Sequence, residues 1–210
     1  MVGQNDRLKQ WELGSHAVAD VGRSAVAVVQ RLGELDSELI ESEASAADAI
    51  ARARDTGDPE ALLAAEGDLA RIGFQAHLWV LGAYELVRVL LLEMSSGTAG
   101  DELLADLLGL KELFTRVRIP LAKFEPASTF KETDYPIADL VTDPTNRRIG
   151  WQVSPTKVVY RRELADRFLE WLLRAGGAGD RYPGHRQEDG NTYAKRSSRG
   201  PTNITVVLWR

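Results

Sequence analysis

The sequence contains no cysteine and only three histidines among its 210 residues. The absence of cysteine excludes disulfides, thiolate nucleophiles and cysteine-bound metals. The histidines lie far apart in the chain, at His16, His77 and His185, which argues against a histidine-rich metal centre. No phosphate-binding loop, serine–histidine–aspartate signature or HExxH pattern is present. We therefore expect no metal or other cofactor.

Long apolar runs are also missing. No run reaches the roughly 18 residues that a membrane span needs, and Met1–Glu12 lacks the apolar stretch of a signal peptide. The net charge of -5 gives no reason to expect broad nucleic-acid binding, although a local basic site stays possible. The default expectation is a cytoplasmic protein without membrane contact.

Apolar residues recur at helical spacing between residues 60 and 94, and this stretch predicts a long helix that organises the fold. The opposite side of this helix is not cleanly polar, which favours a position between other elements. The residues that step by three and four are Leu69, Ile72, Ala76, Trp79, Ala83, Leu86 and Leu90.

A second pattern of this kind precedes it and predicts a helix of roughly 35–40 residues. Asp58 is a good N-cap and Pro59 suits a first turn, so the following helix should begin near Pro59. The short turn makes the two helices antiparallel neighbours in a long hairpin. The apolar line of this earlier helix, which we call its seam, is predicted to consist of Val18, Val21, Ala25, Val28, Leu32, Leu35, Leu39, Ser42, Ala46, Ala49 and Ala53.

Shorter elements are expected after the hairpin. A third helix should start at Thr98 or Asp101 and be interrupted by Pro120. Residues 126–148 are expected to form a long loop, 149–160 a small β-hairpin, and 161–177 a last helix. The β-prone segment 204–209 is expected to pair as a strand, within the chain or with a partner.

These elements together predict a mainly α fold. It is an antiparallel helical bundle led by a long helical hairpin, with a small β-hairpin and a C-terminal strand. Residues 1–174 should form the bundle domain, and 175–210 a linker-like basic tail. The tail carries six Lys/Arg against three Asp/Glu. Its interleaved aromatics allow RNA contact, but a solvated linker is the favoured interpretation.

Four polar residues lie on the predicted central helix: His77, Tyr84, Glu85 and Arg88. Polar groups on a mostly buried helix need hydrogen-bond partners. The favoured interpretation is a buried polar network that holds neighbouring helices in register. The alternative is a functional polar pocket in the bundle core.

Three basic residues cluster around Pro120, namely Arg116, Arg118 and Lys123. Cations beside exposed backbone amides at a helix break can hold a phosphate group. The competing interpretation is a kinked helix with solvated arginines. On the first interpretation these residues bind RNA or a nucleotide phosphate.

Two segments resemble motifs of the HEPN superfamily. Arg118–Glu125 resembles the R-x4-6-H segment, and Ala83–Leu91 resembles the A-x-E-x-x-x-x-x-L helix. The resemblance implies a dimeric helical bundle of toxin–antitoxin, defence or RNA-processing systems, often a metal-independent endoribonuclease. Lys123 occupies the histidine position, and lysine, with an ordinary pKa near 10.4, is a poor base at neutral pH. Arg118 therefore carries over as a phosphate contact and Lys123 as a cation, without catalysis.

The leading functional expectation is a non-enzymatic HEPN-like protein that self-associates or binds a partner protein, with possible contact to RNA or nucleotide phosphate. One alternative is a metal-independent endoribonuclease of a toxin or defence system. The other is a structural assembly protein.

Overall fold

The computed structural model describes residues 4–95 and 101–178. The chain divides into two units, Met1–Gly179 and Asp180–Arg210, and every described element belongs to the first. The predicted C-terminal strand at 204–209 lies outside the described residues. The helices are α1 (Gln4–Ser15), α2 (Arg23–Thr56), α3 (Pro59–Ser95), α4 (Asp101–Lys123) and α5 (Arg161–Ala178), and the strands are β1 (Asp139–Asp143), β2 (Arg148–Ser154) and β3 (Lys157–Tyr160).

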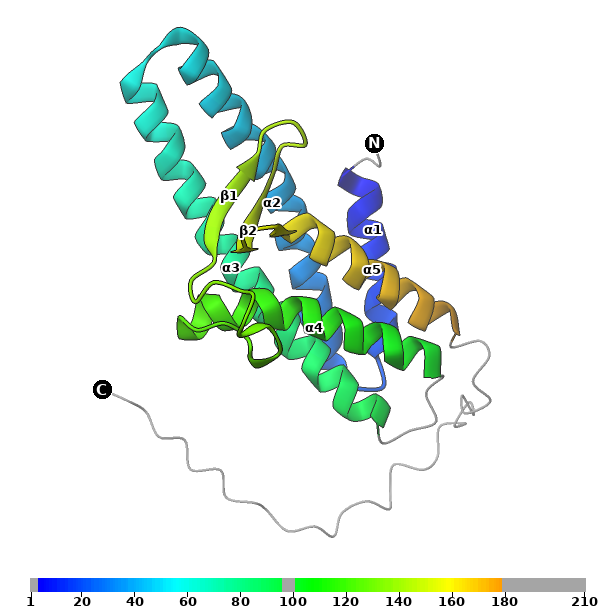
Figure 1. The fold of residues 1–210 in the computed structure, drawn as a ribbon. Coiled ribbons are helices and arrows are strands. Elements are labelled where there is room, and N and C mark those ends of the chain that lie inside the picture. Colours follow the sequence, from blue (N-terminus) through cyan, green and yellow to red (C-terminus); the bar gives the residue numbers. More distant parts are fainter. Residues whose placement is uncertain (1–3, 96–100, 179–210) are drawn as a thin grey trace, which may run out of the picture. The chain divides into compact units, whose positions relative to one another are not determined.

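Helices α2 and α3 form the predicted antiparallel hairpin (Figure 1). The Asp58 carboxylate accepts hydrogen bonds from the backbone N–H groups of Glu60, at 3.0 Å, and Ala61, at 3.1 Å. These bonds satisfy two donors that a helix start leaves open, which fixes the beginning of α3 at Pro59. The mainly α fold with an antiparallel bundle and a small β-hairpin is confirmed.

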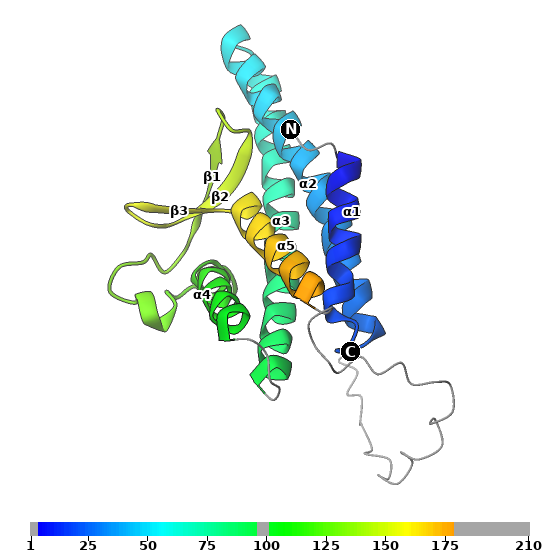
Figure 2. The same cartoon turned by 90° about the vertical axis from the view of Figure 1, so that its right-hand side faces the viewer.

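The other elements pack on both sides of α3. Helices α1 and α2 lie on one side, whereas α4 and the sheet lie on the other, and α5 contacts both groups (Figure 2). Four aromatic rings from α1, α3, α4 and α5 join these layers, with neighbouring centroids 6.0–6.5 Å apart. The rings belong to Trp11, Trp79, Phe114 and Phe168, and all four are buried.

Helix α1 is formed by a polar segment whose sequence fits either a loosely held lead-in or a short helix, and the structure shows a helix of 12 residues. Trp11 is 1% exposed and lies against Gly33 of α2. A Cβ at Gly33 would come within 2.5 Å of the Trp11 side chain, so only glycine allows this approach. One large aromatic contact therefore anchors an otherwise polar segment.

The sheet has three antiparallel strands in the order β1-β2-β3. Strands β2 and β3 are the predicted hairpin, but β1 falls in a segment expected to be a loop. Strand β1 is held by pairing with β2 and by Leu140, whose methyl group lies 2.5 Å from where a Cβ of Gly73 would be. The pairing with β2 is local, across the turn at 144–147, whereas the Leu140 contact to Gly73 is distant in sequence. The prolines and scattered polar residues of this segment gave no strand pattern.

Two further expectations are wrong. Helix α4 continues through Pro120 to Lys123 instead of breaking there. Helix α2 begins at Arg23, and its buried positions differ from the predicted seam: Val28 is 42% exposed, while Val29 is fully buried. The buried line is Val29, Leu32, Asp36, Leu39, Glu43, Ala46, Ile50 and Ala53, which steps by three and four through two carboxylates.

Candidate functional site

The predicted phosphate site begins at Arg116, on α4. Its Nε and Nη2 donate to the two carboxylate oxygens of Asp134, at 2.6 and 2.7 Å. The Asp134 side chain is fully buried, and the guanidinium also lies 4.4 Å from the centre of the Phe130 ring. Arg116 thus holds the segment after α4 in place, and a phosphate would have to displace a buried carboxylate to reach it.

The other two predicted phosphate ligands also lie beside acids. The Arg118 guanidinium stands 4.9 Å from the centre of the Tyr84 ring and 3.8 Å from a carboxylate oxygen of Glu85. Lys123 lies 3.7 Å from Glu125 at the exposed end of α4. The three cations therefore have separate carboxylate partners and do not form one anion-binding site.

The predicted polar network on α3 is divided between the interior and the surface. Tyr84 is buried, whereas the side chains of Glu85 and Arg88 are each 49% exposed and pair at 2.8 Å. The expectation of burial is wrong for these two because they lie opposite the seam that α3 buries. His77 is partly buried, and burial lowers the pKa of its imidazole. Arg118 joins Tyr84 and Glu85, so the structure groups three of the predicted residues.

A buried charge cluster that the sequence did not reveal lies between α1, α2 and α5. The guanidinium of Arg161, with no exposed surface, donates to the carboxylates of Asp36 and Glu43. Asp36 also accepts bonds from Arg7 Nε at 2.6 Å and Trp11 Nε1 at 2.9 Å. The only sequence signal for this cluster was that Asp36 and Glu43 are spaced like the buried apolar residues of α2.

The electrostatics of the cluster keep Asp36 and Arg161 ionised. Burial alone would raise the pKa of the Asp36 carboxyl, but the charges of Arg161 and Arg7 and their hydrogen bonds hold it below its usual range. The pKa of Arg161 is raised: burial acts to lower it, and the charges of Glu43 and Asp36 outweigh that effect. A carboxylate in this state is no general base near neutral pH, so the cluster cross-links helices rather than transferring protons.

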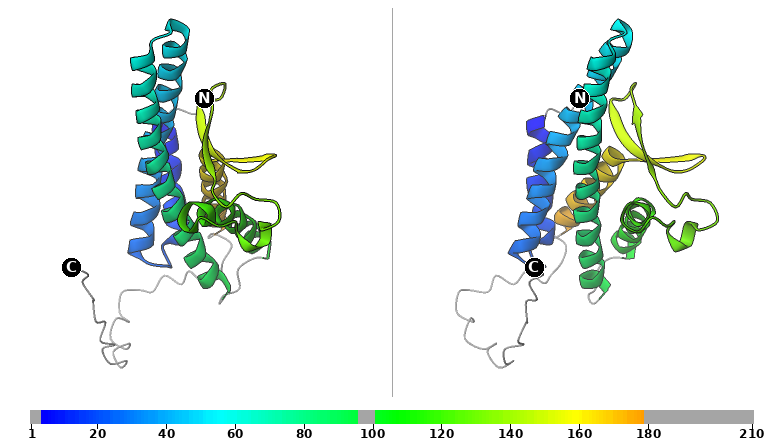
Figure 3. Two further views of the ribbon diagram at one scale, coloured as in Figure 1. Left: turned by 60° about the vertical axis from the view of Figure 1, so that its left-hand side comes forward. Right: turned by 90° about the vertical axis from the view of Figure 1, so that its left-hand side faces the viewer.

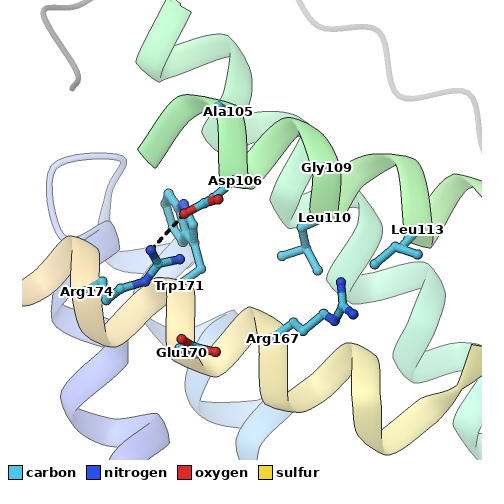
Figure 4. Close-up of a pocket in the computed structure, with 9 residues that line it drawn as sticks. All are labelled: Ala105, Asp106, Gly109, Leu110, Leu113, Arg167, Glu170, Trp171 and Arg174. Atoms are coloured by element: carbon cyan, nitrogen blue, oxygen red, sulfur yellow. Dashed lines mark hydrogen bonds and ion pairs between the residues drawn. The ribbon is translucent and has the colours of Figure 1, made fainter. Parts of the chain in front are cut away.

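A cleft of about 430 Å³ separates α4 from α5 (Figure 4). Its charged groups balance, with Asp106 and Glu170 against Arg167 and Arg174. Arg174 crosses it to bind Asp106 at 2.7 Å. A charge-balanced cleft bridged by its own ion pair has no preference for an anion or a cation. The lining residues are Ala105, Asp106, Gly109, Leu110, Leu113, Arg167, Glu170, Trp171 and Arg174.

The outer face of α3 carries a line of apolar residues. On a helix of 3.6 residues per turn they lie opposite the buried seam of Ile72, Ala76, Ala83, Val87 and Leu90. In the right-hand view of Figure 3, none of the other described helices or strands crosses in front of α3. We name this line the outer stripe. It consists of Leu63, 72% exposed, Phe74, 64%, Leu78, 49%, Leu92, 61%, and the half-buried Leu81.

Comparisons with models of protein families, with curated proteins and with solved structures found no match. The HEPN resemblance therefore stays a prediction. Across residues 4–95 and 101–178 no cluster of three or more histidine, aspartate or glutamate side chains is suited to a metal ion. In the same residues, no helix combines the length and apolar character needed to span a membrane.

Proposed function

We propose that this chain is a non-enzymatic helical protein that works by associating with another protein surface through the outer face of α3. The outer stripe is the observation that carries this proposal. Scattered single apolar residues are ordinary on a protein surface, but five aligned on one helix face are typical of an interaction site. They extend about 44 Å from Leu63 to Leu92, at about 1.5 Å per residue.

The composition of the face around the stripe supports association. Glu85 and Arg88 lie between Leu81 and Leu92 and are half exposed, and Arg71 lies beside Phe74. An apolar centre with a charged rim is the usual composition of a protein interface. Helix-in-groove and helix-to-helix recognition both use apolar anchors at spacings of three and four.

Photo-crosslinking tests the proposal. A photoreactive phenylalanine analogue in place of Phe74, in the full chain in its producing cells, should yield a crosslinked protein adduct. Leu13 provides the matched control, since it is 62% exposed against 64% for Phe74 but lies on α1. The proposal fails if position 74 gives no adduct, or if position 13 gives the same adducts.

Contact with RNA is less well supported by the arrangement of the cations. Arg116, Arg118 and Lys123 each lie within 4 Å of a carboxylate. We expect Arg118→Ala to change affinity for a pool of short RNAs by less than about twofold, measured by filter binding without metal. A large loss of binding in this variant, or its loss of RNA cleavage, would favour the ribonuclease alternative.

A further inference from the structure

Four of the five apolar residues of the outer stripe form a palindrome about a point between His77 and Leu78. Leu63 and Leu92 are equally far from this point, and so are Phe74 and Leu81. A palindrome of apolar residues on a helix face suits a twofold axis, because residue i of one chain meets residue j of the other and the reverse, so each apolar residue meets another. We propose, resting on the function above, that the partner of this face is a second copy of the chain, packed antiparallel with the axis between His77 and Leu78.

The side-chain volumes agree with this register. Between the apolar pairs, the palindrome places Gly67 opposite Arg88 and Ala70 opposite Glu85. Each short residue therefore faces a long one, as interlocking helices require. Gly67 and Ala70 are exposed, and no atom lies within 4 Å of where a Cβ of Gly67 would be, so there is room for the long side chain.

The charges agree as well. In this arrangement Arg71 of one copy lies at the level of Tyr84 of the other copy. Glu85 of that other copy is the next residue, and it lies on the same side of the interface as Arg71. The Arg71 side chain is 61% exposed and pairs with the exposed Asp68 at 3.3 Å, so its guanidinium can reach across. The contact occurs twice because of the symmetry.

Neighbouring registers lose these pairings. A shift of one residue in one direction places Phe74 opposite Gly82 and Leu63 opposite Glu93. A shift in the other direction places Phe74 opposite Val80 and Leu63 opposite Leu91, both of which are buried within their own chain. Of these three registers, only the one centred between His77 and Leu78 pairs Leu63 with Leu92 and Phe74 with Leu81.

The size of the face sets the strength of the dimer. A stripe about 44 Å long and about 10 Å wide covers roughly 440 Å² per copy. This is about half the roughly 800 Å² per partner of a standard stable interface. The dimer should therefore be reversible and form as the concentration rises.

The lack of cysteine makes a direct test possible, because an introduced cysteine is the only thiol in the full chain. Two Leu78 Cα atoms beside the axis would lie about 6 Å apart for helices about 9 Å apart, within disulfide range. Under mild oxidation, Leu78→Cys should form a disulfide-linked dimer on a non-reducing gel. Leu63→Cys and Leu92→Cys should each stay monomeric alone but crosslink to one another when mixed.

The control is Leu13→Cys, which is similarly exposed on α1 and reports random collision. Crosslinking of Leu63→Cys with itself would indicate a parallel pair and overturn the register. Failure of Leu78→Cys to exceed the Leu13→Cys control would overturn the dimer. If the Phe74 adduct then contains a different protein, the proposed function stands and only the second copy is wrong. If Phe74 gives no adduct either, both proposals fail.

Discussion

Helices α2 and α3 distribute polar and apolar residues in opposite ways. Helix α2 buries two carboxylates, Asp36 and Glu43, whereas α3 exposes Phe74 and Leu92. The difference lies in the partner that each face meets. Arg161 neutralises the acids of α2, while no described element covers the outer stripe of α3. Burial in this protein follows the available partners more closely than the polarity of the residue.

The largest expected effect comes from removing the shared cation. Arg161→Met would leave Asp36 and Glu43 buried with less compensation, and breaking a buried ion pair in this way costs about 3–5 kcal/mol. Urea unfolding followed by circular dichroism measures the loss. Arg167→Met is the matched control on the same helix, since the Arg167–Glu163 pair is exposed and should contribute about 0–1 kcal/mol. Equal losses in the two variants would contradict the structural role of Arg161.

A double substitution sharpens this result. Adding Glu43→Met to Arg161→Met removes the uncompensated acid, while Asp36 keeps its bonds from Arg7 and Trp11. We expect the double variant to be more stable than Arg161→Met by about 1–3 kcal/mol, because an apolar pair often replaces a buried ion pair at little cost. The same unfolding experiment checks it, and a double variant less stable than the single one would contradict the prediction.

Acid should weaken the buried cluster. The folded pKa of Asp36 lies below its ordinary value of 3.8, so the unfolded chain takes up protons first as the pH falls. This contribution to stability is therefore complete above about pH 5 and is lost as the pH falls through the folded pKa. Urea midpoints measured between pH 6 and pH 2.5 should decline less steeply in Asp36→Asn than in the wild type. A decline in Asp36→Asn as steep as in the wild type would contradict this contribution of Asp36.

The smallest effect on folding is expected at the outer stripe. Phe74→Gln should change the free energy of unfolding by less than about 0.5 kcal/mol, because most of this side chain is already in water. A destabilisation above about 2 kcal/mol, by the same unfolding assay, would mean that Phe74 packs within its own chain. The expected difference in stability loss between Phe74→Gln and Arg161→Met would then disappear.

Local signals predicted the hairpin well. Asp58 and Pro59 fixed the turn, and the seam through Ile72, Ala76 and Trp79 is buried in the structure. These features depend on neighbours within a few residues, which a sequence pattern records directly. The β2–β3 hairpin was predictable for the same reason.

Features that depend on distant partners were not predictable. Counting apolar residues placed Val28 and Ser42 on the buried face of α2 and left out Asp36 and Glu43. The acids are buried because Arg161 reaches them from more than a hundred residues away. Likewise, Arg116 looked free to bind phosphate because nothing in its own helix indicates the bond to Asp134.

The distance along the chain between Glu43 and Arg161 has a consequence for synthesis. Their bond spans 118 residues. At about 5–20 residues per second, the ribosome delivers Arg161 roughly 6–24 s after Glu43. The hairpin is complete only when α3 ends at Ser95, 66 residues before Arg161, so it exists for about 3–13 s with two acids that have no cation from α5. Helices α2 and α3 can form early, but their packing is completed only when the last described helix emerges.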